Sequence, residues 1–107
     1  MNIDLMQLEF IDYDLRVIAV ELEKQIGMTL EITSQHRIGD PGVHGQLPLR
    51  GIDIRCFDDV IGERLAILVN QKWIYDPKRP EYSCAIYHDT GKGKHLHLQS
   101  HPRTVRR

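Results

Sequence analysis

The stretch GIDIRCF, residues 51–57, alternates apolar and polar side chains. Successive side chains of a β-strand point to opposite faces of the sheet. Ile52 and Ile54 therefore share one face, which we expect to be buried. Asp53 and Arg55 share the opposite face. The stretch predicts a sheet with one side in the core and one side that carries polar groups.

Amphipathic segments before and after this strand predict two helices. The first is expected over residues 14–26, with Asp12 or Asp14 as its N-cap. Its apolar face is formed by Leu15, Ile18, Leu22 and Ile26, and Gly27 is expected to end it. The second is expected over residues 58–73, with Asp58 as its N-cap. Its buried stripe is Ile61, Leu65, Leu68 and Trp73.

Shorter alternating runs predict the remaining strands. Residues 29–34 form one, and the Gly- and Pro-rich residues 36–50 that follow predict an irregular loop. Residues 83–88 and 95–99 flank a glycine turn at 89–94, which predicts a β-hairpin. The order helix, strand, loop, strand, helix, hairpin indicates an α+β fold, a small antiparallel sheet with two main helices.

Length and composition are those of an ordinary globular chain. The 107 residues, 41% hydrophobic and 27% charged, correspond to a single domain over residues 1–107. A formal net charge of -1 gives the chain as a whole no electrostatic footprint for nucleic acid. Arg103, Arg106 and Arg107 make residues 102–107 a basic tail, which we expect to be flexible and solvated.

The sequence gives no sign of membrane insertion or export. No apolar run approaches the ~20 residues that cross a bilayer. Residues 1–10, MNIDLMQLEF, carry acids where a signal peptide has a basic start, so we expect the chain to remain in the cytoplasm at synthesis. Without export, Cys56 and Cys84 are expected to be reduced, buried thiols.

Two histidines lie two positions apart in KHLHLQ, residues 94–99. In a strand, His95 and His97 share one face. Leu96 and Leu98 then share the other, core-facing side. Neighbouring imidazoles on a polar face suit a metal ligand beside a base, and the alternative is an exposed face that is merely rich in histidine. The other histidines are expected in loops or at the surface: His36, His88 and His101.

His44 and Asp53 stand at the two ends of HGQLPLRGID, residues 44–53. A catalytic zinc ion takes three nitrogen or oxygen ligands and keeps a fourth position open for water. His44, Asp53 and one histidine of the pair at 95 and 97 would supply such a set. The carboxylate would offset part of the metal charge and leave the ion acidic enough to activate water. The sequence therefore predicts a zinc site.

Three short motifs occur in order along the chain: ITSQHR at 32–37, VHGQLPLRGIDIR at 43–55 and KHLHLQ at 94–99. In this order they resemble the motifs of the zinc D-Ala-D-Ala carboxypeptidase and L-Ala-D-Glu endopeptidase family, in its His-x-His subgroup. The resemblance spans residues 32–99, about two thirds of the chain. It implies the hedgehog/DD-peptidase fold and cleavage of cell-wall peptides.

The resemblance also implies a role for each matching residue. His44, Asp53 and His97 would be the zinc ligands. His95 would be the active-site histidine beside the metal, and Arg37 would stabilise charge on the scissile carbonyl oxygen.

The chain departs from the family pattern at several positions. The interval from His to Asp is two residues longer than usual, with residues 47–49, Leu-Pro-Leu, in the glycine-rich part. Gly42 and Gly51 replace a serine and an alanine. Lys94 stands where members with a carboxylate base carry Glu or Asp, which leaves His95 as the base.

Together these features predict a small zinc metallopeptidase, of the endolysin type found in phages and prophages, that hydrolyses peptidoglycan peptides. It would reach the wall through another protein or as part of a virion. Lys94 keeps open a second interpretation, a zinc-binding structural or cell-wall-binding module of the same fold with little or no turnover. A nucleic-acid enzyme with His-Asp metal chemistry is a third, and the lack of a basic face disfavours it. An alignment with His36 as the first ligand is also open, although its distance to Asp53 is far from the family interval.

Overall fold

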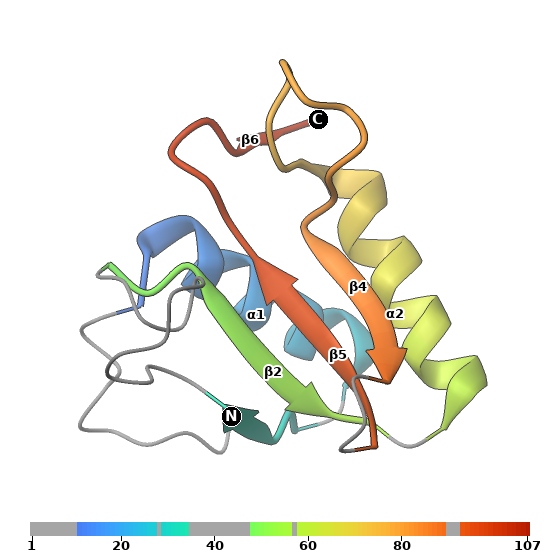
Figure 1. Ribbon diagram of the computed structural model, residues 1–107. Coiled ribbons are helices and arrows are strands. Elements are labelled where there is room, and N and C mark those ends of the chain that lie inside the picture. Colours follow the sequence, from blue (N-terminus) through green and yellow to red (C-terminus); the bar gives the residue numbers. More distant parts are fainter. Residues whose placement is uncertain (1–10, 28, 35–47, 57, 90–92) are drawn as a thin grey trace.

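The computed structural model has two helices on one side of a four-stranded sheet (Figure 1). It describes residues 11–27, 29–34, 48–56, 58–89 and 93–107. The elements of these residues are α1 (Tyr13–Ile26), β1 (Ile32–Ser34), β2 (Gly51–Arg55), α2 (Asp59–Lys72), β3 (Trp73–Ile74), β4 (Ala85–Asp89), β5 (Lys94–Gln99) and β6 (Val105–Arg106). The sheet order is β1-β2-β5-β4, with every neighbouring pair antiparallel. The expected α+β class, with a small antiparallel sheet and two main helices, is confirmed.

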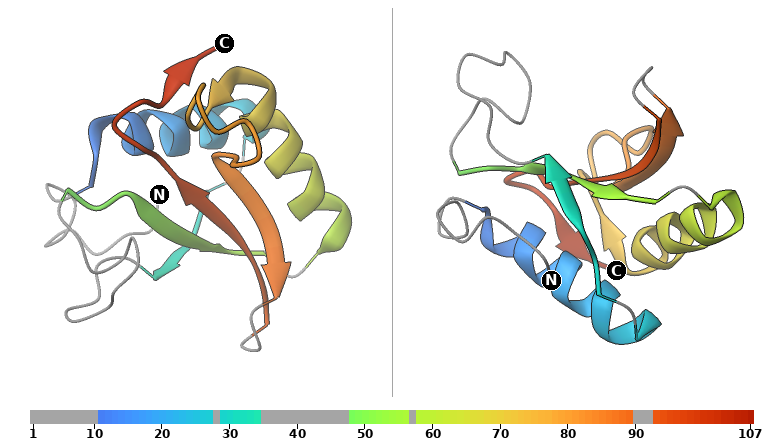
Figure 2. Two further views of the ribbon diagram at one scale, coloured as in Figure 1. Left: turned by 45° about the horizontal axis from the view of Figure 1, so that its top comes forward. Right: turned by 90° about the horizontal axis from the view of Figure 1, so that it is seen from below.

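The sheet has one apolar face, and both helices cover it (Figure 2). The register of β2 and β5 pairs Ile52 with Leu98, and Ile54 with Leu96. Each of these four side chains is at most 1% exposed. The alternation predicted for both strands is therefore confirmed.

Helix α1 begins and ends where local chemistry predicts. The carboxylate of Asp12 accepts a hydrogen bond from the Leu15 amide at 3.3 Å, which makes it the N-cap. Gly27 ends the helix in the left-handed conformation, with φ at 68°, which glycine adopts at little cost. The helix buries Leu15, Ile18, Ala19 and Leu22 against the sheet and α2.

Helix α2 is capped as expected, but its buried stripe differs from the prediction. Asp58 accepts from the Ile61 amide at 3.1 Å. Leu65 is buried, whereas Ile61 is 38% exposed. The helix turns Gly62 toward the sheet, where a β-carbon would come within 2.2 Å of the Tyr87 ring, so that close contact sets the rotation of the helix. Leu68 is half-buried and packs against the core, and Trp73 is buried as expected, although it is the first residue of β3.

Residues 102–107 do not form the solvated tail that the sequence suggests. Strand β6 pairs with β3, and Thr104 is only 6% exposed. The Arg106 guanidinium donates to both carboxylate oxygens of Glu21, at 3.1 and 2.8 Å, and lies 4.4 Å from the Trp73 ring centroid. Backbone pairing, an ion pair through Nη1 of Arg106 and a cation–π contact together hold this segment in place.

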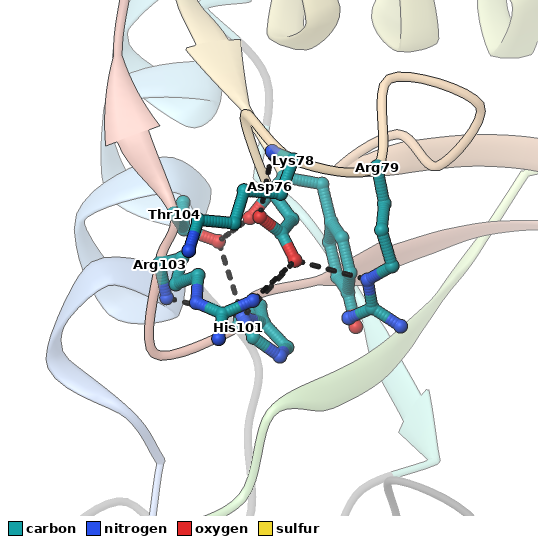
Figure 3. Close-up of polar contacts among 7 residues, drawn as sticks. Asp76, Lys78, Arg79, His101, Arg103 and Thr104 are labelled. Atoms are coloured by element: carbon teal, nitrogen blue, oxygen red, sulfur yellow. Dashed lines mark hydrogen bonds and ion pairs between the residues drawn. The ribbon is translucent and has the colours of Figure 1, made fainter.

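A fully buried carboxylate ties this segment to the turn after β3 (Figure 3). Asp76 accepts from the Lys78 amide at 3.0 Å and from Arg79 Nε at 2.9 Å. Its Oδ2 also lies 3.4 Å from Nη1 of Arg103 and 3.9 Å from Nδ1 of His101. His101, expected at the surface, is therefore half-buried at this cluster.

Both cysteines are free thiols in the structure, Cys84 buried and Cys56 half-buried. Burial raises the pKa of Cys84 to about 12, so this thiol stays protonated. Among the described residues, no helix is long and apolar enough to span a bilayer.

Candidate functional site

The face of the sheet opposite the helices carries an aspartate and several histidines on three adjacent strands. Asp53 of β2 pairs directly with His97 of β5. His95, two positions before on β5, pairs directly with His88 of β4. Residues directly opposite each other in neighbouring strands share a face, so the four side chains gather on one surface.

The Asp53 carboxylate lies between two imidazoles. Its Oδ1 is 2.8 Å from Nδ1 of His97 and 3.7 Å from Nε2 of His95. The three side chains are only 14%, 13% and 16% exposed, respectively. Partial burial strengthens electrostatic interactions among them relative to those in bulk water. This carboxylate–imidazole group is the chemical centre of the site.

The orientation of His95 makes it suitable as a base. Its Nδ1 lies 3.3 Å from the carbonyl oxygen of Gly93, which can only accept a hydrogen bond. Nδ1 therefore carries the hydrogen. In the neutral ring, Nε2 then has a free electron pair, and this is the nitrogen that faces Asp53. His95 can accept a proton at Nε2 from a group bound at this face.

His88 belongs to the same group, although we expected it at the surface. Its ring meets that of His95 edge-on at 4.6 Å between centroids, and lies 6.1 Å from that of His97. Burial, followed by the neighbouring His95 and His97, lowers its pKa, so the ring is favoured in its neutral form. The signal that could have identified His88 is the register of the predicted hairpin, which sets this residue opposite His95.

Lys94 points away from this face. As the neighbour of His95 in a strand, it lies on the helix side, where its ammonium binds the Asp59 carboxylate at the start of α2. The Tyr87 hydroxyl lies 3.2 Å from the same carboxylate oxygen. The lysine at the family's carboxylate-base position therefore does not place its charge beside the histidines.

The structure brings together three of the five site residues that the sequence predicts, Asp53, His95 and His97. His44 and Arg37 fall within 35–47, outside the described residues, as does His36.

The donors that are described fit part of a zinc site. Asp53 and His97 are ligand types that zinc accepts, and their nearest atoms face each other from adjoining strands. Tetrahedral ligands on bonds of about 2.0–2.1 Å stand roughly 3.3 Å apart, so a small side-chain adjustment would admit an ion. Over the ranges that the structure covers, no three His, Cys, Asp or Glu side chains are grouped to hold a metal. A third ligand has to come from elsewhere, and His44 is the residue predicted for that position.

Comparisons with models of protein families, with curated proteins and with solved structures found no match. The function therefore has to be inferred from the chemistry of this face and from the motifs that form it.

Proposed function

We propose that this chain is a zinc-dependent peptidase that hydrolyses peptidoglycan peptides, with the hedgehog/DD-peptidase fold. The observation that carries the proposal is the position of Asp53 between His97 and His95 on the face opposite the helices. This grouping unites a metal-binding carboxylate, a metal-binding imidazole and an oriented base. The peptide substrate, the action at the cell wall and the phage or prophage origin are supported by the motif resemblance.

In this proposal Asp53, His97 and His44 hold the zinc ion. The segment that contains His44 leaves β1 at Ser34, which is the register partner of Asp53. It returns at Pro48, four residues after His44. The described chain therefore enters the segment that contains His44 directly beside Asp53.

A bound zinc ion supplies Lewis acidity and brings the pKa of water down to ~7. His95 accepts a proton at Nε2 from the attacking water and returns it to the leaving amine as the C–N bond breaks. His88, held neutral, packs edge-on against His95 and limits its rotation. Arg37 would offset charge on the carbonyl oxygen.

Zinc content and peptide release, measured on the purified chain, test the proposal together. We expect wild type to bind zinc and to release soluble peptides from peptidoglycan, as detected by mass spectrometry. His97→Ala and His44→Ala should lose both. His101→Ala is the matched control, because it removes a half-buried histidine from the Asp76 cluster instead, and it should keep both.

Wild-type protein without zinc, or His97→Ala with an unchanged zinc content, would overturn the proposal. Zinc binding through His97 without peptide release would favour the alternative, a zinc-stabilised structural or cell-wall-binding module of the same fold.

A further inference from the structure

Gln99 ends β5 on the same face as His97, and its side-chain amide has a defined orientation. The amide nitrogen donates to the backbone carbonyl of Ser83 at 2.7 Å. Because a carbonyl oxygen can only accept, the amide nitrogen has to be the end that faces Ser83. The amide oxygen is thereby directed at His97 and lies 3.1 Å from its Nε2. Gln99 is 9% exposed, so the contact is well shielded from water.

The oriented amide determines which nitrogen of His97 carries a hydrogen. Since the Gln99 oxygen only accepts, Nε2 of His97 has to donate. Nδ1 faces Asp53 at 2.8 Å, and because a carboxylate also only accepts, Nδ1 donates to it in the metal-free protein. With Nε2–H held by Gln99, Nδ1 is the nitrogen that would give up its hydrogen to a metal ion between His97 and Asp53.

We propose that Gln99 is a positioning residue that presents Nδ1 of His97 to the metal. This inference rests on the proposed zinc site. The contacts form a chain from the Ser83 carbonyl through the Gln99 amide and the His97 ring to Asp53. Rotating the ring by half a turn would replace both nitrogens with carbons and break both of its contacts. Hydrogen-bond partners of this kind fix the tautomer and direction of metal-binding histidines.

Two substitutions at Gln99 and one matched control test the role. Gln99→Met keeps the length of the side chain and removes the amide, whereas Gln99→Glu keeps an acceptor for Nε2–H. Ser83→Ala removes only a hydroxyl and leaves the carbonyl that orients Gln99. Zinc dissociation constants of the full chain are measured by competition with a chromogenic chelator. We expect Gln99→Met to weaken zinc binding roughly 10–100-fold and Ser83→Ala to stay close to wild type. Gln99→Glu keeps the acceptor for Nε2–H but loses the donor to the Ser83 carbonyl, so its zinc affinity should fall between these two.

A second readout needs no variant and does not depend on turnover. Wild type labelled with NMR-active nitrogen in histidine and loaded with NMR-active cadmium should show metal–nitrogen coupling at Nδ1 of His97. Coupling at Nε2, or zinc binding by Gln99→Met equal to that of wild type, would overturn the role of Gln99 and leave the zinc site standing. Wild type that binds neither metal would overturn the proposed function itself, and this inference with it.

Discussion

Asp53 and Asp76 are both shielded aspartates with histidine nearby, yet their other partners differ in kind. Asp76 is fully buried and is held by the guanidinium groups of Arg79 and Arg103. Guanidinium stays protonated at any accessible pH and has no electron pair for a metal. The imidazoles beside Asp53 can release a proton or bind a metal. We therefore expect Asp53 to take part in metal binding or proton transfer, and Asp76 to stabilise the fold.

The ionisation of Asp76 supports this distinction. Burial by itself would raise the pKa of its carboxyl group, but the Lys78 amide, Arg79 and Arg103 together hold the pKa below its ordinary value. The carboxylate stays charged and keeps the turn after β3 joined to the C-terminal segment, through contacts visible in Figure 3.

In the comparison of Asp53 with Asp76, the largest expected effect is the loss of turnover in His95→Gln. The variant loses the base at Nε2 but leaves Asp53 and His97 in place, so turnover should fall roughly 10²–10⁴-fold while zinc content stays the same. Steady-state hydrolysis of a purified muropeptide, with metal analysis of the same sample, measures both. Turnover near that of wild type would remove His95 from the mechanism.

Asp76→Asn should change stability without changing metal binding. Asp76 itself is fully buried, and an amide there would remove the charge that Arg79 and Arg103 share and could set a buried N–H against their N–H groups, which is costly to leave unsatisfied. We expect the Tm to fall by roughly 10 °C or more, with zinc content unchanged. Circular dichroism melts of the chelator-treated protein test this, with Asp53→Asn as the counterpart that should melt near wild type. Equal losses in the two variants would erase the distinction between the two aspartates.

The same cluster should govern the acid limit of stability. A carboxyl group whose pKa is lower in the folded protein stabilises the fold above its unfolded pKa of about 3.9, and that contribution disappears as the pH falls through the folded value. The free energy of unfolding of wild type should therefore drop below about pH 4, and that of Asp76→Asn should drop less. Urea titrations across this range measure it, and parallel curves would exclude Asp76 as the source.

The smallest effect is expected at Lys94. Because its ammonium binds Asp59 on the helix side and not the site, Lys94→Ala should leave zinc content and turnover almost unchanged. A large gain in turnover would show that the lysine suppresses the site, and a large loss would give it a catalytic part.

Features of the fold that depend on local chemistry are the ones that the sequence predicts correctly. Alternation in residues 51–55 and 94–99 and the caps Asp12 and Asp58 need only neighbours in the chain. The pairing of β3 with β6 could not be predicted in this way, because strands of two residues show no periodicity.

In the candidate site, too, the features that depend on neighbours in the chain are the ones that the sequence predicts. The shared face of His95 and His97 follows from alternation within one strand, and Asp53 from alternation within another. His88 was missed because its position depends on how β4 pairs with β5. Gln99 was missed because its orientation depends on the backbone carbonyl of Ser83, just before β4. Single-strand patterns carry neither piece of information.

The most direct measurement is the zinc stoichiometry of the full chain in wild type, Asp53→Asn and Asp76→Asn, by equilibrium dialysis and elemental analysis. We predict one zinc ion per chain in wild type and in Asp76→Asn, and a large loss in Asp53→Asn. Wild type without zinc, or Asp53→Asn that binds zinc as wild type does, would contradict a metal site at Asp53.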